Sequence, residues 1–160
     1  MKGVKGWVIA VLLIWVAGAF QLAVAFQISF AGVGPDFPLI VISTVGLFAS
    51  RRNGSGLGFI GGAIHGAVAG GHMAAYTITR TLVGFLVGAF AGMEFEGNGS
   101  VAFIVTAAAT VFTQISFLLL APRGAILPSL LATIGSAMYN GVLAIPLYAL
   151  LKRVLDSPRR

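Results

Sequence analysis

The 160-residue chain contains no cysteine and carries little charge. The absence of cysteine excludes disulfide bonds, thiolate catalysis and cysteine-ligated metals. Only 9% of the residues are charged and 58% are hydrophobic, whereas about a quarter of the residues of a typical soluble domain are charged. The composition therefore predicts an integral membrane protein, with the lipid bilayer as its main surroundings.

Acidic residues are the scarcest charged type. The four are Asp36, Glu94, Glu96 and Asp156, all at or beyond the ends of apolar segments. Without a carboxylate pair inside a segment, acid–base hydrolysis and a buried carboxylate proton relay are not expected. The two histidines have no acid nearby in the sequence, and zinc usually takes roughly three or four protein ligands. We therefore expect no catalytic residue, no metal, no cofactor and no enzymatic activity.

Apolar residues form six segments, separated by stretches rich in glycine, proline and charge. Their approximate bounds are 7–30, 37–50, 57–70, 73–92, 101–121 and 126–151. The first segment is longer than a signal-peptide core and is interpreted as a retained span. The pattern predicts an all-α membrane protein with six transmembrane helices, the second and third short, in one integral membrane domain over residues 1–160.

The basic residues lie at the edges of the apolar segments. With the N-terminus in the cytoplasm and six spans, Arg123 alone lies in an outer loop and Arg80 lies within the fourth span. The remaining basic residues lie inside: Lys2, Lys5, Arg51, Arg52, Lys152, Arg153, Arg159 and Arg160. This bias follows the positive-inside rule and predicts a multi-pass protein of the bacterial inner (cytoplasmic) membrane with both termini in the cytoplasm. Because the basic residues form no patch, we expect no nucleic-acid binding despite the net charge of +6.

Glycines recur every fourth residue in two of the segments, from Gly54 to Gly70 and from Gly84 to Gly92. Residues four apart share a helix face, so each row exposes bare backbone, which allows close helix packing in a membrane. The candidate packing residues are Gly58, Gly62, Gly66, Gly70, Gly84 and Gly88. These faces could pack within the chain's own bundle or against a helix of another protein, and both alternatives remain open.

A few polar side chains lie within the segments. The candidates are His65, His72, Tyr76, Arg80, Gln114 and Asn140. His72, Tyr76 and Arg80 are four apart and share a face, and the cost of a charge in lipid means that Arg80 should face protein or water. Arg80 could reach the outer headgroups, bond carbonyl groups, or serve a partner interface or polar cavity. We expect His65 to bond within the bundle as a neutral ring, and Gln114 and Asn140 to form interhelical hydrogen bonds.

The order of four motifs resembles the MreD family, the small membrane subunit of the bacterial rod-shape machinery. The motifs are PDFPLIVISTVGLFASRR, GLGFIGGAIHGAVAGG, YTITRTLVGFLVGAF and YNGVLAIPLYALLKRVL. The matched positions are Gly58, Phe59, Gly62, Leu82, Gly84, Phe85, Gly88, Asn140, Pro146, Tyr148, Lys152 and Arg153. MreD-like sequences commonly carry an aspartate just after the glycine-rich element, where this chain has His65 and Gly66.

The resemblance implies a non-enzymatic inner-membrane scaffold of the complex that synthesises peptidoglycan during cell elongation. It would bind MreC, a single-span periplasmic coiled-coil protein, through transmembrane helix packing. A RodA-type glycosyltransferase, its penicillin-binding transpeptidase and the actin-like MreB are the further implied partners. The family is also similar in fold to the six-helix substrate-binding subunits of energy-coupling-factor vitamin transporters. The alternative is therefore such a transporter subunit, with His72, Tyr76 and Arg80 in a ligand pocket near the outer face.

Overall fold

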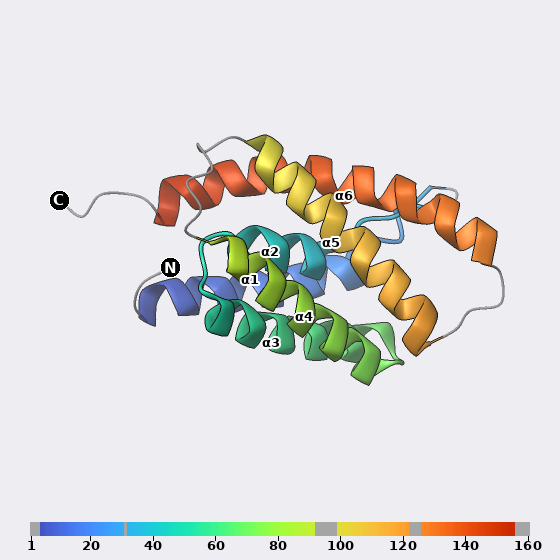
Figure 1. Ribbon diagram of the computed structural model, residues 1–160, viewed down its shortest axis with the longest axis horizontal. Coiled ribbons are helices and arrows are strands. Elements are labelled where there is room, and N and C mark those ends of the chain that lie inside the picture. Colours follow the sequence, from blue (N-terminus) through green and yellow to red (C-terminus); the bar gives the residue numbers. More distant parts are fainter. Residues whose placement is uncertain (1–3, 31, 92–98, 122–125, 156–160) are drawn as a thin grey trace.

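The computed structural model describes residues 4–30, 32–91, 99–121 and 126–155, and in this part of the chain it consists of six α-helices without a named strand (Figure 1). The helices are α1 (Val4–Ala23), α2 (Phe37–Gly46), α3 (Arg51–Ala69), α4 (Met73–Phe90), α5 (Gly99–Leu120) and α6 (Ile126–Leu155). The all-α class predicted from the sequence is confirmed. The residues of the α4–α5 and α5–α6 connections, which include Glu94, Glu96 and Arg123, lie outside the described residues.

Four of these helices are long and apolar enough to cross a membrane, namely α1, α4, α5 and α6. Helix α2 has ten residues and is therefore about 15 Å long, half the thickness of the hydrocarbon core. Helix α3 is long enough, but it begins with Arg51 and Arg52 and is rich in glycine, which lowers its hydropathy. The structure therefore corrects the expected count of six spans, and it does not support the similarity to six-span transporter subunits.

Helix α2 lies in the middle of the bundle and contacts all five other helices. Every residue from Pro38 to Gly46 is buried, which fits a helix that is apolar all round. One core cluster joins α2 to its neighbours on α1, α3 and α4, with Ile14, Ile42, Leu57 and Val83 among its members. A ten-residue helix can therefore sit inside the membrane domain because protein, not lipid, surrounds it.

Helices α3 and α4 form an antiparallel hairpin with backbone-to-backbone contact along both glycine rows. A Cβ atom on Gly62 would lie 2.6 Å from the Cα of Thr77, and one on Gly66 would lie 2.7 Å from the Cα of Met73. Gly88 faces Arg51 in the same way, at 2.9 Å from its Cα. Gly58 faces the carbonyl oxygen of Arg80, and Gly84 faces Gly54.

These contacts bear on the two alternatives left open for the glycine rows. Five of the six candidate glycines pack within the hairpin, so the chain's own helices already occupy the face that a partner helix would need. The sixth, Gly70, ends α3 with a left-handed backbone (φ 68°), a conformation that favours glycine at a helix C-terminus. These contacts favour packing within the chain's own bundle, and the packing of a partner helix on these glycines stays a prediction.

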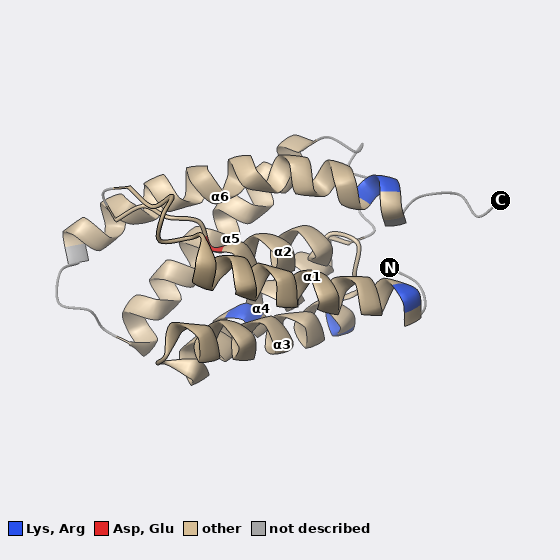
Figure 2. Ribbon diagram, turned by 180° about the vertical axis from the view of Figure 1, so that it is seen from behind, with Lys and Arg blue, Asp and Glu red and all other residues tan. Residues whose placement is uncertain are grey.

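Basic residues gather at one end of the molecule. Figure 2 shows the blue starts of α1 and α3 and the blue end of α6 at the same end, near both chain termini. The end of α6 carries Lys152 and Arg153, and the start of α3 carries Arg51 and Arg52. The fold thus brings together basic residues from distant parts of the sequence, as the positive-inside rule requires for residues on one side of a membrane.

Candidate functional site

The first turn of α2 lies inside the bundle, and side chains from three elements satisfy its backbone N–H groups. Asp36 caps the helix, since its carboxylate accepts a hydrogen bond from the Leu39 N–H at 3.0 Å. Gln21 of α1 accepts from the Phe37 N–H at 2.9 Å, and Asn140 of α6 accepts from the Asp36 N–H, also at 2.9 Å. Pro38 has no N–H to satisfy. A helix start buried without such partners would be strongly destabilised.

Arg80 of α4 is the charged partner of this helix start. Its side chain is 1% exposed, and its Nη2 forms an ion pair with Oδ2 of Asp36. The sequence left open whether Arg80 reaches the outer headgroups, bonds carbonyl groups or lies in a polar site. In the structure the guanidinium is buried and pairs with a carboxylate. Its partner lies 44 residues away, at a position that the sequence places at the edge of an apolar segment.

His65 of α3 completes the charged group. Its Nδ1 lies 3.3 Å from Oδ1 of Asp36 and 3.2 Å from Nη2 of Arg80. A protonated Nδ1 donates to the carboxylate, and an unprotonated Nδ1 accepts from the guanidinium. The buried imidazole therefore has a partner in the bundle in either tautomer.

Tyr76 forms the wall of this group on the side of α4. Its ring stacks on the imidazole of His65, with centroids 4.2 Å apart and an interplanar angle of 22°. Phe117 of α5 packs on the same tyrosine at 4.6 Å. The Cζ of Arg80 lies 5.3 Å from the centroid of the Tyr76 ring, within the range of a cation–π interaction.

Asn140 links this group to the remaining helices. It is fully buried, and its Nδ2 donates to Oγ1 of Thr110 on α5 at 3.1 Å. Five of the helices therefore contribute side chains to one connected polar set, and the sixth, α2, is capped by Asp36 of the same set. We call this set the polar centre: Gln21, Asp36, His65, Tyr76, Arg80, Thr110 and Asn140.

Two of the candidates from the sequence lie outside the polar centre. His72 is exposed in the turn before α4, with φ 52° and no capping hydrogen bond from its side chain. Gln114 is exposed and lines a cavity of about 180 Å³ between α5 and α6, together with Ser129 and Thr133. The sequence predicted that His72, Tyr76 and Arg80 share one face. In the structure Tyr76 and Arg80 point into the bundle, whereas His72 does not.

The polar centre is suited to holding helices together. One carboxylate balances one guanidinium, and in the described part of the chain no cluster of three or more potential metal ligands occurs. The cavity between α4 and α5 and the one between α5 and α6 are lined by other residues. The transporter alternative placed Tyr76 and Arg80 in a ligand pocket, but both side chains pack against protein.

The sequence of the whole chain supplies the decisive comparison. The family model of the rod shape-determining protein MreD matches residues 1–157. The chain belongs to the MreD family. Membership gives it a role in rod-shape determination and agrees with the four long apolar helices of a membrane protein. No curated protein and no solved structure matches the chain.

The position of His65 brings it next to an acid from another part of the chain. The structure places the carboxylate of Asp36 3.3 Å from that histidine. The acid that pairs with His65 and Arg80 therefore comes from the start of α2. The sequence offered one signal for this position of Asp36. An aspartate directly before Phe37 and Pro38 is a preferred residue for capping the start of a helix.

Proposed function

We propose that the chain is a non-enzymatic inner-membrane scaffold subunit of the complex that synthesises peptidoglycan during cell elongation. It binds the transmembrane helix of an MreC-like protein, and through this contact it joins the RodA-type glycosyltransferase and its penicillin-binding transpeptidase. The observation that carries the proposal is the match to the MreD family over residues 1–157.

The use of the polar side chains supports a scaffold. In the polar centre the charged and amide groups bond to one another or to the start of α2, so their interactions serve the fold. The outward faces of the long helices are formed mostly by apolar side chains. Such faces act through packing with other helices or with lipid.

Helix α1 offers a suitable face for the partner. It packs mainly on α2 and α3, and its outer side exposes Val8, Leu12, Trp15 and Leu22. With the exposed Ala19 between Trp15 and Leu22, the spacing alternates between four and three residues, which is the spacing of a helix–helix seam. We propose that the MreC-like helix lies along this face.

The distribution of charge supports the orientation. An even number of long apolar helices leaves both termini on one side, and the basic starts of α1 and α3 lie at the same end as the basic end of α6 (Figure 2). By the positive-inside rule this end faces the cytoplasm. We propose a multi-pass inner-membrane protein with cytoplasmic termini.

The absence of cysteine makes a direct test possible, because every introduced cysteine is the only one in the chain. Leu12→Cys places a thiol on the outer face of α1, and Met138→Cys places a matched thiol on the exposed face of α6. Each variant is co-expressed with the MreC-like protein of the same bacterium, which carries single cysteines along its transmembrane helix, and the membranes are oxidised.

The expected result is a disulfide-linked heterodimer from Leu12→Cys and little or none from Met138→Cys. A heterodimer formed only from Met138→Cys would move the partner to α6. If the two unmodified proteins do not co-purify in mild detergent, the scaffold role itself is contradicted.

A further inference from the structure

Two buried polar atoms in the described part of the chain have no hydrogen-bond partner in the protein. They are Nε of Arg80 on α4 and Oγ1 of Thr113 on α5. Both residues are buried, so the surface of the molecule does not supply the missing partner. Burying a polar group without a hydrogen bond is costly, and buried groups that lack a protein partner are commonly bonded to ordered water.

The hydroxyl of Thr113 is used differently from those of the other threonines in the helices. The hydroxyl of Thr106 shares a hydrogen bond with Ser43 of α2 at 2.9 Å. The other hydroxyls donate to the carbonyl oxygen four residues earlier in their own helix, at Thr44, Thr77, Thr79, Thr81, Thr110 and Thr133. A helical threonine has two common χ1 rotamers, one of which permits this backbone bond. Thr113 does not form it, and its hydroxyl is left for a different partner.

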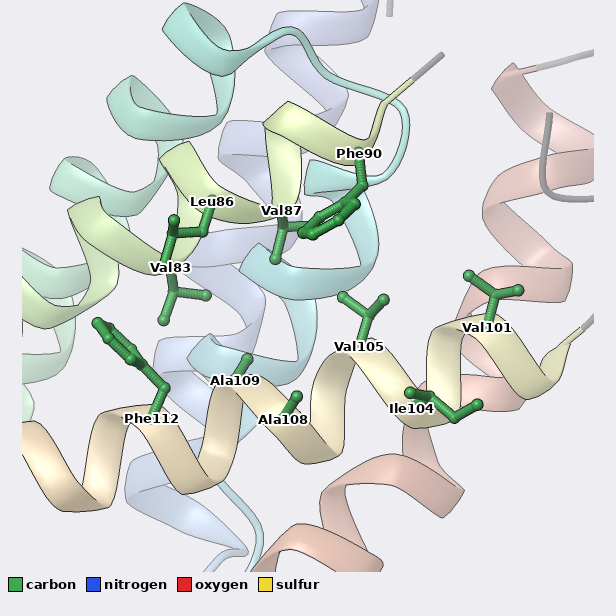
Figure 3. A pocket seen from close by; sticks show the side chains of 10 residues that line it. All are labelled: Val83, Leu86, Val87, Phe90, Val101, Ile104, Val105, Ala108, Ala109 and Phe112. Carbon is green, nitrogen blue, oxygen red and sulfur yellow. The ribbon is translucent and has the colours of Figure 1, made fainter. Parts of the chain in front are cut away.

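The two atoms belong to residues at the same level of facing helices. Phe117 of α5 packs on Tyr76 of α4, with ring centroids 4.6 Å apart. Figure 3 shows that α4 and α5 run in opposite directions. Arg80 follows Tyr76 by about one turn, and Thr113 precedes Phe117 by about one turn. Arg80 and Thr113 therefore lie opposite each other.

The contacts of the polar centre lead to the same place from the other side. Thr110, one turn before Thr113 on the same face of α5, accepts a hydrogen bond from Asn140. Asn140 in turn accepts from the N–H of Asp36, and the carboxylate of Asp36 pairs with Arg80. The neighbours of Thr113 along α5 are thus connected to Arg80 in both directions, through Phe117 and through Thr110.

We propose that one internal water molecule binds between Arg80 and Thr113. The water accepts a hydrogen bond from the Nε–H of Arg80 and donates one to Oγ1 of Thr113. Internal waters make about two to four hydrogen bonds, typically to buried polar groups that the protein leaves unsatisfied. The two unsatisfied atoms supply the minimum of this range.

The water completes the hydrogen bonding of the guanidinium. Nη1 of Arg80 donates to Thr79, and Nη2 donates to Asp36. With the water at Nε, each of the three nitrogens has a partner. The water also adds a polar link between α4 and α5, which face each other with hydrocarbon side chains on the cytoplasmic side of this level.

The test is an NMR measurement of magnetisation transfer from water to the arginine Nε–H groups of the full chain, labelled with ¹⁵N-arginine in detergent micelles. The Arg80 signal is assigned by its loss in Arg80→Lys. We expect a cross-peak between this Nε–H and water with the sign of a dipolar contact, which distinguishes a bound water from chemical exchange.

Matched variants show whether Thr113 holds the same water. Thr113→Val replaces the hydroxyl by a methyl group of the same shape and should remove the cross-peak, whereas Thr113→Ser keeps a hydroxyl and should keep it. The control is Thr133→Val, which removes a buried hydroxyl that donates to Ser129 of its own helix, and it should keep the cross-peak. A missing cross-peak in the unmodified chain, or one that persists in Thr113→Val, overturns the proposal.

The melting temperature in detergent gives a second readout. Thr113→Val should lower it, because the substitution leaves the Nε–H of Arg80 buried without an acceptor; removal of a hydroxyl that had no partner would keep or raise it. In the background of Arg80→Lys, which lacks the Nε–H, the same substitution should lower the melting temperature less. An equal decrease in both backgrounds, or no decrease in either, would show that the two residues share no water.

Discussion

Helix α4 meets two of its neighbours, α3 and α5, in opposite ways. Toward α3 it presents Gly84 and Gly88, and the two backbones touch. Toward α5 it presents Val83, Leu86 and Phe90, and a groove of about 400 Å³ remains. Because lipid tails are as apolar as leucine, helices in a membrane associate through close packing and hydrogen bonds. The comparison indicates that α3 and α4 are joined by close backbone contact, whereas α4 and α5 leave an apolar groove between them.

Arg80 takes part in the close contact with α3 through its backbone and in the polar centre through its side chain. Its carbonyl oxygen lies against Gly58 of α3, and its guanidinium pairs with Asp36 at the start of α2. The glycine contact brings α4 close enough to α3 for Arg80 to share the carboxylate with His65. The close packing and the polar centre are therefore expected to fail together.

The largest expected effect is that of Gly62→Leu. A Cβ atom there would lie 2.6 Å from the Cα of Thr77, and backbone cannot move aside as a flexible side chain can. Overpacking of a core costs about 1–3 kcal/mol where side chains can shift, and because backbone would have to move here, we expect a larger cost than for any of the substitutions below. We expect loss of the monodisperse peak in size-exclusion chromatography, and no loss for Ala67→Leu on the exposed side of α3. A folded Gly62→Leu protein would contradict the tight contact.

The second effect is that of Arg80→Met, which keeps much of the volume but leaves the carboxylate of Asp36 without its cation. Removing one partner of a buried ion pair costs about 3–5 kcal/mol, so the melting temperature in detergent should fall sharply. In the double variant with Asp36→Asn, no uncompensated charge remains, and we expect part of the stability to return. A double variant less stable than Arg80→Met would show that the pair is not the source of the effect.

The sequence predicted much of this fold, because its strongest signals are local. Apolar segments with charges at their edges predicted helices in a membrane, and the four-residue spacing of glycine predicted close packing. The partner of the glycine rows could not be predicted, since the spacing is the same whether Gly62 faces Thr77 of this chain or a helix of another protein. The span of α2 was overestimated because an apolar stretch such as 37–50 has the same composition in lipid and inside a protein.

The polar centre was predicted only in pieces. His65, Tyr76, Arg80 and Asn140 were recognised as polar groups within apolar segments, but Asp36 was placed at a segment end. The sequence shows where a charge lies along the chain, whereas the depth of Asp36 depends on Gln21 and Asn140, which hold the start of α2 inside the bundle. That depth is a property of the tertiary structure.

A smaller effect is expected for Asn140→Ala. The change leaves the Asp36 N–H without its acceptor and removes the donor to Thr110. An unsatisfied buried polar group costs about 1–3 kcal/mol, so thermal unfolding in detergent should occur at a lower temperature, though less so than for Arg80→Met. Gln114→Ala is the control, because Gln114 is exposed, and it should leave the melting temperature unchanged. Equal effects of the two substitutions would contradict the role of Asn140 at the start of α2.

The smallest effect is expected for Ala108→Leu. This change places a leucine on α5, in the groove between α5 and α4, whereas Gly62→Leu places one on α3, in the tight contact between α3 and α4. The added carbons enter a groove lined by hydrocarbon (Figure 3), and they meet lipid or detergent chains there instead of backbone. Because those chains are as apolar as the leucine, little transfer free energy is gained or lost, and the stability should change by less than about 0.5 kcal/mol. Thermal unfolding of both leucine variants in one detergent measures the contrast between the two sides of α4. If Ala108→Leu destabilises the protein as much as Gly62→Leu, then α5 lies as close to α4 as α3 does, and the contrast between the two sides of α4 is contradicted.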